Sequence, residues 1–533
     1  MQADCTQIPY HLTGAFSKIV TDYLEEAETI QPFYRHAVNL QGIKDAIEAR
    51  KQFPQNRQLL VAELNNQYSG LEKSALLKEN IYSLSHNTTF TVTTAHQPNI
   101  FTGPIYFVYK ILHAIRLAAY LSQQFPDYKF VPVYYMGSED ADLDELGSIT
   151  VNGRKYTWQT KQTGAVGRMK VDAAFIALIH ELNGQLGVTP HGQQLIEIFR
   201  QCYRQGITIQ QATLELVNRL FGELGLIVLV PDNASLKRSF NAVVSKELIE
   251  GFSHTAVSQT ISKLEEHYKV QAGGRELNLF YLLDNKRERI EKENDKYRVK
   301  ALQLEWTIEN LLIELDAHPE RFSGNVILRG AFQETVLPNI AFIGGGGELA
   351  YWIELKKVFE AVSIPYPVLV LRNSFLLMDE QWNKKIAAMG FNTADIFKPE
   401  QELLELIVQR QSLNEFELNG QLMQVQDFYQ GIKVMAANID STLSGHVDAL
   451  KAKAVKRLLQ LEKKMKSAEK RKFSVQLEQI QKLKAALFPN GNLQERVESL
   501  SGFYARYGGG VITLLLDNSL SLEQQFCVLS IKQ

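Results

Sequence analysis

The chain has 533 residues, of which 22% are charged and 45% hydrophobic, and its formal net charge is −2 at pH 7. This balance is typical of a globular protein and gives no reason to expect binding to nucleic acid or to a membrane surface. No apolar run approaches the length of about 18 residues that a membrane span needs, and the first residues lack the pattern of a secretion signal. We therefore expect a cytoplasmic protein.

At about 150 residues per domain, this length predicts three or four structural units. The three cysteines, Cys5, Cys202 and Cys527, lack the spacing of a metal site and are too few for a disulfide framework. We therefore expect no bound metal and a reducing environment. Apolar residues recur at helical spacing in much of residues 1–88, which predicts a helical N-terminal segment.

Residues 89–94 are β-branched or aromatic and predict a buried strand. A polar turn with His96, Gln97 and Asn99 follows, and Pro104 then precedes an apolar run of helical spacing. Proline suits the first position of a helix because its φ is fixed and its missing N–H is not needed there. Backbone N–H groups at a helix start favour an anion, so this turn is a candidate site. The alternative is a turn that only connects two buried elements.

Residues 129–136 predict a second strand, and the spacing of strand, helix and strand predicts a parallel sheet. Glu139 and Asp140 follow this strand directly. Ligands of parallel sheets bind at the carboxyl ends of the strands, so we expect the acidic pair beside the His96 turn. Carboxylates there could bind an amine, a sugar hydroxyl or a metal, or act as a base. The alternative is a solvated acidic turn.

The rest of the N-terminal part contains a third strand near residues 226–230 and two insertions into the core. The first insertion, residues 148–224, contains an Asn-Gly turn typical of a β-hairpin and then a helical pattern. In the second, residues 268–324, we interpret the charged run 286–300 as a solvated face. The predicted core therefore comprises residues 89–147, 225–267 and 325–400.

A glycine run gives a second candidate loop. Gly344, Gly345, Gly346 and Gly347 follow an apolar strand and precede a helical pattern, so the backbone there could approach a ligand closely. The spacing matches neither a P-loop nor a dinucleotide fingerprint, and a tight structural turn is an equal alternative. A further strand ends at Arg372, whose planar guanidinium suits a carboxylate or a phosphate.

Residues 401–488 are rich in Leu, Lys, Glu and Gln and predict a helical arm, an antiparallel coiled coil. Between residues 449 and 484, twelve Lys or Arg face three Glu, a local charge of +9. Solvated flanks of the coiled coil explain this charge, with an anionic partner as the alternative. Residues 489–533 are expected to form a short mixed tail. The predicted apolar seam contains Leu458, Leu461, Met465 and Ala468, and it resumes at Ile480, Leu483 and Leu487.

Several long stretches, in this order, resemble the bacillithiol biosynthesis cysteine-adding enzyme family over nearly the whole chain. They are His96-Gln97-Pro98 with Gly103-Pro104-Ile105-Tyr106 and Lys110; Ser138-Glu139-Asp140 with Asp142; residues 333–338 with 344–351; and Phe488-Pro489-Asn490-Gly491 with residues 493–497.

The resemblance implies an α/β fold: a Rossmann-like, predominantly parallel core with two connecting-peptide insertions and a C-terminal coiled coil through which the family forms homodimers. It also implies an amide-forming ligase that adds cysteine to the amine of glucosaminyl malate, the last step of bacillithiol biosynthesis. The core is similar to that of class I aminoacyl-tRNA synthetases, with His96 in the place of their histidine-bearing nucleotide signature. Their lysine-rich signature is not identifiable, so ATP or another nucleotide is left open as a cofactor. Where we expect the family to carry histidine, this chain has Ala141.

Two other functions fit the sequence. One is a class I synthetase-like, nucleotide-binding enzyme that acts on another amino acid, and the other is a dimeric coiled-coil scaffold. The set of polar residues at predicted strand ends argues against the scaffold. The sequence shows no module typical of tRNA-anticodon binding, so nothing favours a complete synthetase.

Amide formation needs an amine without its extra proton and a stabilised carbonyl oxygen. We expect Glu139 or Asp140 to bind and deprotonate the amine, His96 to act on the carbonyl side, and Arg372 to bind the malate carboxylates. The expected substrate-binding residues are Gln97, Asn99, Gly103, Tyr106, Lys110, Asp142, Gln333, Glu334, Asn339, Gly344, Gly345, Gly346, Gly347, Glu348, Tyr351 and Arg372. A second nucleotide site is considered at Phe488, Asn490, Gly491 and Arg496, with a helix-ending turn as the alternative.

Overall fold

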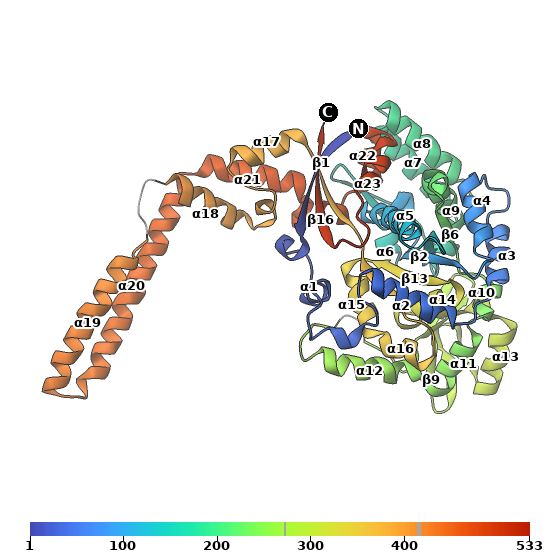
Figure 1. Ribbon diagram of the computed structural model, residues 1–533, viewed down its shortest axis with the longest axis horizontal. Coiled ribbons are helices and arrows are strands. Elements are labelled where there is room, and N and C mark those ends of the chain that lie inside the picture. The colour runs from blue at the N-terminus through green and yellow to red at the C-terminus, as the bar shows by residue number, and fades with distance from the viewer. Residues whose placement is uncertain (271–272, 413–416, 533) are drawn as a thin grey trace. The chain divides into compact units, whose positions relative to one another are not determined.

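The computed structural model describes residues 1–270, 273–412 and 417–532. The chain forms two compact units, one made of Met1–Met378 with Asn492–Gln533 and the other of Asp379–Gly491. The first unit contains a parallel sheet, and the second is helical (Figure 1). Within the described part of the chain, no helix is long and apolar enough to cross a membrane.

A five-stranded parallel sheet with strand order β14-β13-β2-β3-β6 lies at the centre of the first unit. Its residues are almost all buried, as expected for a parallel sheet that is covered on both faces. The predicted α/β fold with a Rossmann-like parallel core is therefore confirmed. The strands are β2 (Thr89–His96), β3 (Lys129–Met136), β6 (Ile227–Leu229), β13 (Asn339–Gly344) and β14 (Val368–Leu371).

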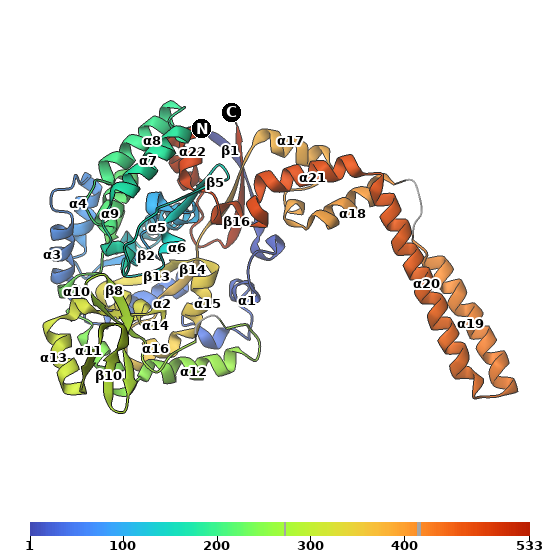
Figure 2. The same cartoon turned by 180° about the vertical axis from the view of Figure 1, so that it is seen from behind.

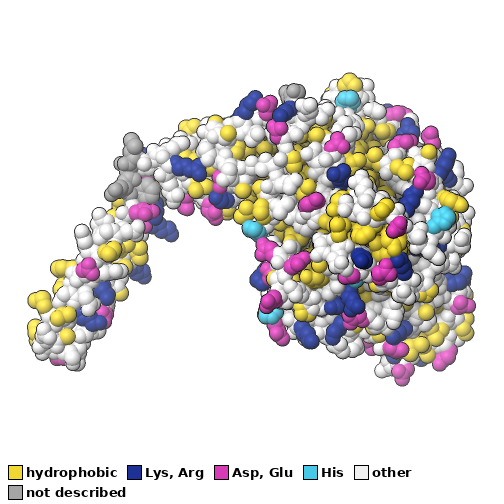
Figure 3. Space-filling model, in the orientation of Figure 1, with side chains coloured by type: hydrophobic (Ala, Val, Ile, Leu, Met, Phe, Trp, Pro, Cys, Tyr) yellow, Lys and Arg dark blue, Asp and Glu magenta, His cyan; other side chains and the backbone are white. Residues whose placement is uncertain are grey.

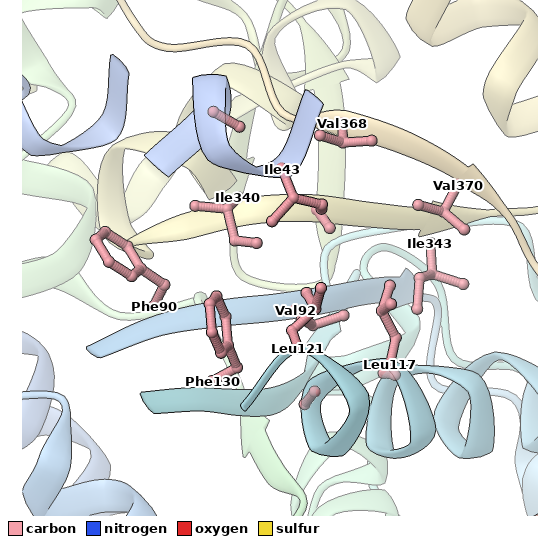
Figure 4. Packing of buried hydrophobic residues seen from close by; sticks show 14 of the residues in the cluster. Ile43, Phe90, Val92, Leu117, Leu121, Phe130, Ile340, Ile343, Val368 and Val370 are labelled. Carbon is pink, nitrogen blue, oxygen red and sulfur yellow. The ribbon is translucent and has the colours of Figure 1, made fainter. Parts of the chain in front are cut away.

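Two helices, α2 (Leu40–Lys51) and α5 (Tyr106–Gln124), supply much of the core. Ile43 and Ile47 of α2 and Leu117 and Leu121 of α5 lie in one buried cluster with side chains of the sheet (Figure 4). A spacing of four residues keeps each pair on one face of its helix. Burial of one such side chain contributes about 1.5–3 kcal/mol, so this packing fixes α5 against the strands.

The start of α5 differs from the prediction. The helix begins at Tyr106 with Ile105 as its N-cap, so Pro104 lies outside it. The Pro104 carbonyl instead accepts a hydrogen bond from the N–H of Phe107, 3.1 Å away, and so closes the turn that opens the helix.

The remaining helices around the sheet are α1 (Lys18–Leu24), α3 (Arg57–Gln67), α4 (Ala75–Ser83), α10 (Ala234–Arg238), α11 (Asn241–Glu250), α12 (Phe252–Leu264), α14 (Val326–Val336), α15 (Gly346–Glu354) and α16 (Lys356–Ala361).

Both insertions contain small antiparallel sheets. Asn152 and Gly153, with φ of 49° and 78°, form the predicted hairpin turn between β4 and β5. The charged run of the second insertion is not only a solvated face, because it forms three short strands. The short helix α6 (Leu143–Leu146) ends the core stretch before the first insertion. The first insertion contains β4 (Ser148–Val151), β5 (Arg154–Thr157), α7 (Ala173–Leu186), α8 (Pro190–Cys202) and α9 (Ile209–Phe221). The second contains β7 (Leu279–Leu283), β8 (Lys286–Arg289), β9 (Glu291–Glu293), β10 (Lys296–Val299), β11 (Leu304–Trp306), α13 (Ile308–Ala317) and β12 (Phe322–Gly324).

The N-terminal segment is not entirely helical. Its first element, β1 (Gln2–Pro9), pairs antiparallel with β16 (Gln525–Lys532), which neighbours β15 (Ser374–Asp379). The expected mixed tail therefore contains a strand of this sheet, and it also contains α22 (Leu500–Tyr507) and α23 (Gly510–Asp517). On the face of this unit seen in Figure 3, cationic and anionic side chains are interspersed, in agreement with the small net charge.

In the second unit, α19 (Asn419–Ile439) and α20 (Leu443–Arg471) lie side by side along the arm (Figures 1 and 2). Leu458 and Met465 of the predicted seam are partly buried, and its continuation at Ile480, Leu483 and Leu487 is buried. Leu461 and Ala468 are exposed, so the seam is wrong at these two positions for the single chain. The other helices of this unit are α17 (Glu380–Ala388), α18 (Glu400–Gln411) and α21 (Ser474–Leu487).

Three predicted cleft residues lie at the amino end of the central sheet instead. Gln333 and Glu334 belong to the last turns of α14, and Asn339 begins β13. Glu334 is fully buried, forms an ion pair with Arg50 of α2, and accepts hydrogen bonds from the Gln333 and Asn339 amides at 3.0 and 2.7 Å. Burial raises the pKa of Glu334 to about 7, although the Arg50 guanidinium opposes this shift. This cluster ties α2 to α14 and β13.

We expect Arg50→Ala to lower the free energy of unfolding by about 3–5 kcal/mol, because it removes the cation of a buried ion pair and the donors to the Asn339 and Glu334 carbonyls. Urea unfolding at pH 7.5 measures the change. The matched control is Lys44→Ala on the exposed face of the same helix, which should change the free energy by less than about 0.5 kcal/mol. A loss below about 1 kcal/mol for Arg50→Ala would contradict a structural role for the pair.

Candidate active site

A cavity of about 500 Å³ lies where β2, β3 and β13 end and α5 and α15 begin. The chain reverses direction at each of these points, so polar residues from distant parts of the sequence meet at one edge of the sheet. Ten of the predicted catalytic and substrate-binding residues line this cavity: His96, Gln97, Tyr106, Lys110, Gly345, Gly346, Gly347, Glu348, Tyr351 and Arg372.

His96 ends β2 and is 7% exposed. Its carbonyl accepts hydrogen bonds from the Gly137 N–H at 2.8 Å and the Tyr134 hydroxyl at 3.0 Å, which join the ends of β2 and β3. Burial lowers the pKa of the imidazole well below its ordinary value, and the nearby Lys110 and other cations add to this shift. The ring is therefore neutral at neutral pH. Its Nε2 is buried and has no hydrogen-bond partner among the described residues.

The glycine run joins β13 to α15. Gly344 ends the strand, Gly345 is the N-cap and Gly346 and Gly347 form the first turn of the helix. None of the four has a positive φ, so conformational freedom does not explain them. Lack of space explains the glycine at position 344, because a Cβ there would lie 2.8 Å from a Leu349 methyl carbon. The tight join brings the helix start, with its backbone N–H groups and positive dipole end, to the cavity wall.

Two cations of the cavity are already paired. Lys110, only 1% exposed, forms an ion pair with Glu348 and donates a hydrogen bond to the Ala95 carbonyl at 2.8 Å. Arg372 donates to the Glu495 carboxylate at 2.6 Å, and both side chains are buried. The Nε of Arg372 is buried without a hydrogen-bond partner among the described residues, so its role toward a substrate carboxylate stays a prediction.

Glu139 and Asp140 line an adjoining cavity of about 210 Å³, which shares Gly137 and Arg329 with the first. Glu139 is held on both sides, by an ion pair with Lys237 and by a 3.1 Å hydrogen bond from the Ser323 hydroxyl. It is therefore a poor candidate for the base.

Asp140 is the more available carboxylate. It accepts a 3.1 Å hydrogen bond from the Gln97 amide and lies 3.8 Å from the Arg329 guanidinium. Burial opposes ionisation, but Arg329 and Gln97 together lower the pKa of Asp140 below its ordinary value. Asp140 is therefore a carboxylate at neutral pH.

Four other predicted residues, Asn99, Gly103, Asp142 and Gly344, do not line either cavity. Gly103, with φ of 61°, packs against the Asn99 side chain within the turn that follows β2, where an added Cβ would lie 2.6 Å from the amide nitrogen. Asp142 caps α6 by accepting a hydrogen bond from the Glu145 N–H at 3.1 Å. Ala141, which replaces the expected histidine, is exposed and lies outside both linings.

The four residues considered for a second nucleotide site belong to different units. Arg496 lies in the first unit and lines the His96 cavity. Phe488, Asn490 and Gly491 lie in the second, where Phe488 packs edge-on against Phe397. The N–H of Gly491 donates to the Phe488 carbonyl at 3.0 Å, in the manner of a helix-ending turn.

Sequence reasoning missed Arg329 and Arg287. Arg329 lies in the first half of α14, which precedes β13, so it stands at the edge where the strands end. The direction of helix and strand was readable from the sequence, and it also explains why Gln333 and Glu334 lie at the opposite edge. Arg287 lies on β8 of the second insertion and lines the Asp140 cavity. No sequence signal separates it from its charged neighbours.

Family models match both parts of the chain. Residues 1–373 match the model described as bacillithiol biosynthesis BshC, N-terminal Rossmann-like domain, and residues 375–531 match the BshC C-terminal coiled-coil domain. The chain belongs to the bacillithiol biosynthesis BshC family. This confirms the family that the sequence resembles.

Relatives match over their full length. A protein from Flavobacterium johnsoniae named "Putative cysteine ligase BshC" is 39% identical, and the match covers 100% of both chains. A protein of the same name from Flavobacterium psychrophilum is 36% identical over 99% of each chain. A solved structure from Campylobacter jejuni, described as "putative arginyl t-RNA synthetase", covers 85% of this chain and 100% of its own at 14% identity and a TM-score of 0.21, a likeness too low to support an argument.

We expect Gly344→Ala to lower the free energy of unfolding by about 1–3 kcal/mol, because the added methyl group overpacks the join between β13 and α15. Chemical denaturation of the full chain measures this loss. Gly184→Ala is the matched control: it lies within α7 with nothing within 4 Å of an added Cβ, and should stabilise by up to about 1 kcal/mol. Equal effects of the two substitutions would show that the join is not tightly packed.

Proposed function

We propose that this chain is an amide-forming ligase that joins the carboxyl group of cysteine to the amine of glucosaminyl malate and so yields bacillithiol. The observation that carries the proposal is the placement of one available carboxylate, Asp140, in a cavity that shares a wall with the cavity of the neutral His96. The names of the relatives support the cysteine ligase part of the proposal.

Asp140 has the properties of an amine-binding group. As a carboxylate at neutral pH, it attracts the substrate in its ammonium form, and Gln97 fixes one of its oxygens at 3.1 Å. A low carboxylate pKa makes Asp140 a weak base for a free ammonium group. The reacting fraction is therefore the neutral amine, which has released one proton to solvent and has a lone pair for the carboxyl carbon. As the C–N bond forms, the nitrogen becomes far more acidic, and Asp140 takes the second proton.

The opposite side of the site suits an anionic oxygen. His96 offers a buried Nε2 without a protein partner among the described residues, and the first turn of α15 lines the same cavity. Four cationic side chains, Lys110, Arg329, Arg372 and Arg496, and two carboxylates line it as well. These groups would stabilise the carboxyl oxygen of cysteine or an activating phosphate while the C–N bond forms and the bond to the leaving oxygen breaks.

A deletion strain tests the reaction whatever the route by which the carboxyl group is activated. Mass spectrometry should show lost bacillithiol and accumulated glucosaminyl malate, both restored by the wild-type gene. Purified Asp140→Asn and His96→Ala should lose about 10²–10³-fold in rate, the usual cost of removing a transition-state contact, and neither gene should restore bacillithiol fully.

The control is Asp144→Asn, an exposed carboxylate of α6, which should restore bacillithiol normally. Urea unfolding of each purified variant separates loss of chemistry from loss of folding. Normal bacillithiol in the deletion strain would refute the proposed reaction, and full restoration by the Asp140 and His96 variants would refute the roles of these residues.

We also propose that the chain forms a homodimer through its helical arm. Phe428, Met435 and Ile439 of α19 are spaced by seven and four residues, so they share one helix face, and they are 64, 69 and 84% exposed. Leu459 and Leu461 of α20 are also about half exposed, at 49 and 48%. Uncovered apolar side chains in this number are typical of a surface that another molecule covers.

Light scattering of the full chain at micromolar concentration should give twice the monomer mass of 60.5 kDa. Phe428→Glu with Met435→Glu places charges on the apolar face and should shift the mass toward the monomer. Gln430→Glu adds a charge at an exposed position of the same helix outside this set and should leave the mass unchanged. A monomeric wild-type chain would contradict the dimer.

A further inference from the structure

The Asp140 cavity continues toward the second insertion. It shares Phe280, Asn325 and Val326 with a further cavity of about 290 Å³. Its walls therefore come from two sources: the end of β3, which carries Asp140, and the hairpin of β7 and β8, which carries Phe280 and Arg287. A ligand bound at Asp140 is thus in reach of the hairpin.

Arg287 is the cation of this cavity that is not held by a carboxylate. Its guanidinium carbon lies 3.9 Å from the centre of the Phe280 ring, which fixes its plane. One terminal nitrogen makes only long contacts, 3.4 Å to the Ser323 hydroxyl and 3.5 Å to the Gly324 carbonyl. Its Nε is buried without a hydrogen-bond partner, and no ion pair of Arg287 occurs among the described residues.

A second polar group of the same cavity also lacks a partner. Ser138, directly before the acidic pair, is 0% exposed, and its hydroxyl has no hydrogen-bond partner among the described residues. A buried polar group left without a bond costs about 1–3 kcal/mol, so two in one cavity point to a ligand that supplies acceptors. The remaining arginine of the cavity, Arg329, is already engaged by Asp140 and by the Tyr351 side chain.

We propose that Arg287 binds a malate carboxylate of the acceptor substrate, with the Ser138 hydroxyl as a second donor; this inference rests on the proposed function. In glucosaminyl malate the amine and the malate group are on neighbouring carbons of the sugar. A substrate whose amine contacts Asp140 therefore has its carboxylates a few ångströms away, at the wall that Arg287 forms. A guanidinium presents two parallel N–H groups to a carboxylate, which suits this recognition.

The position of Arg287 also explains how the site would recognise this acceptor. Arg289, two residues further along β8, lines the next cavity and gives the second carboxylate a cation. A glucosamine that carries a neutral group instead of malate could reach Asp140 but would leave Arg287 unpaired. Discrimination would then come from the insertion and the amine chemistry from the core.

Calorimetric titration of the full chain with two acceptors tests the assignment without any catalytic turnover. The acceptors are glucosaminyl malate and methyl 2-amino-2-deoxyglucoside, which has the same amine and no carboxylate. Arg287→Gln should weaken binding of glucosaminyl malate about 10- to 100-fold and leave binding of the methyl glycoside unchanged. Arg287→Lys keeps the charge but not the paired donors, so its affinity for glucosaminyl malate should lie between those of the wild type and Arg287→Gln.

The matched control is Arg298→Gln, in the same insertion, whose side chain is ion-paired with Glu293 and Glu305 and lines none of the three cavities. It should leave both affinities unchanged. The proposal is overturned if Arg287→Gln affects the two acceptors equally or neither of them, or if the wild-type chain does not bind glucosaminyl malate. If the selective loss is seen while the deletion strain retains normal bacillithiol, the carboxylate site stands and the proposed reaction falls.

Discussion

The parallel direction of the five central strands is the constraint on which the site depends. Because β2, β3 and β13 all end at the same edge, the residues that follow them are brought together although they are far apart in the chain. The hydrogen bonds from Gly137 and Tyr134 to the carbonyl of His96 then set the distance between the first two strand ends. Helix starts at this edge add fixed partial positive charges that no side chain needs to supply.

Local chemistry in the sequence was sufficient to predict the strands of the central parallel sheet and much of the cavity wall. Strand propensity and chain reversal are encoded by neighbouring residues. A β-branched or aromatic run therefore predicts a strand, and the polar residues or glycines after it predict the turn. This pattern occurs before His96, before Glu139 and Asp140, and before the glycine run. The identity of the paired groups was not encoded in this way. Arg372 seemed free until Glu495, from the other end of the chain, was placed beside it.

The failures have a common physical origin in long-range pairing. Glu334 lies at the amino end of the sheet, away from the cleft, because a helix that precedes a parallel strand runs in the opposite direction to it. Its partner Arg50 belongs to a helix that is distant in the sequence. β1 was not recognised because its hydrogen-bonding partner is near the other end of the sequence. Arg287 can be recognised as a cavity residue only in the folded chain, where the β7–β8 hairpin and the end of β3 line the same cavity.

The order of segments along the chain has a consequence for biosynthesis of the protein. The second unit is one continuous stretch, whereas the first is interrupted and is completed only by residues that are translated after the second unit. Until Glu495 has been synthesised, the Arg372 guanidinium has no carboxylate and β1 has no β16 to pair with. Folding of the first unit therefore cannot be completed until the whole second unit has been translated. A chain stopped within the arm would retain the sheet but not the finished wall of the cavity.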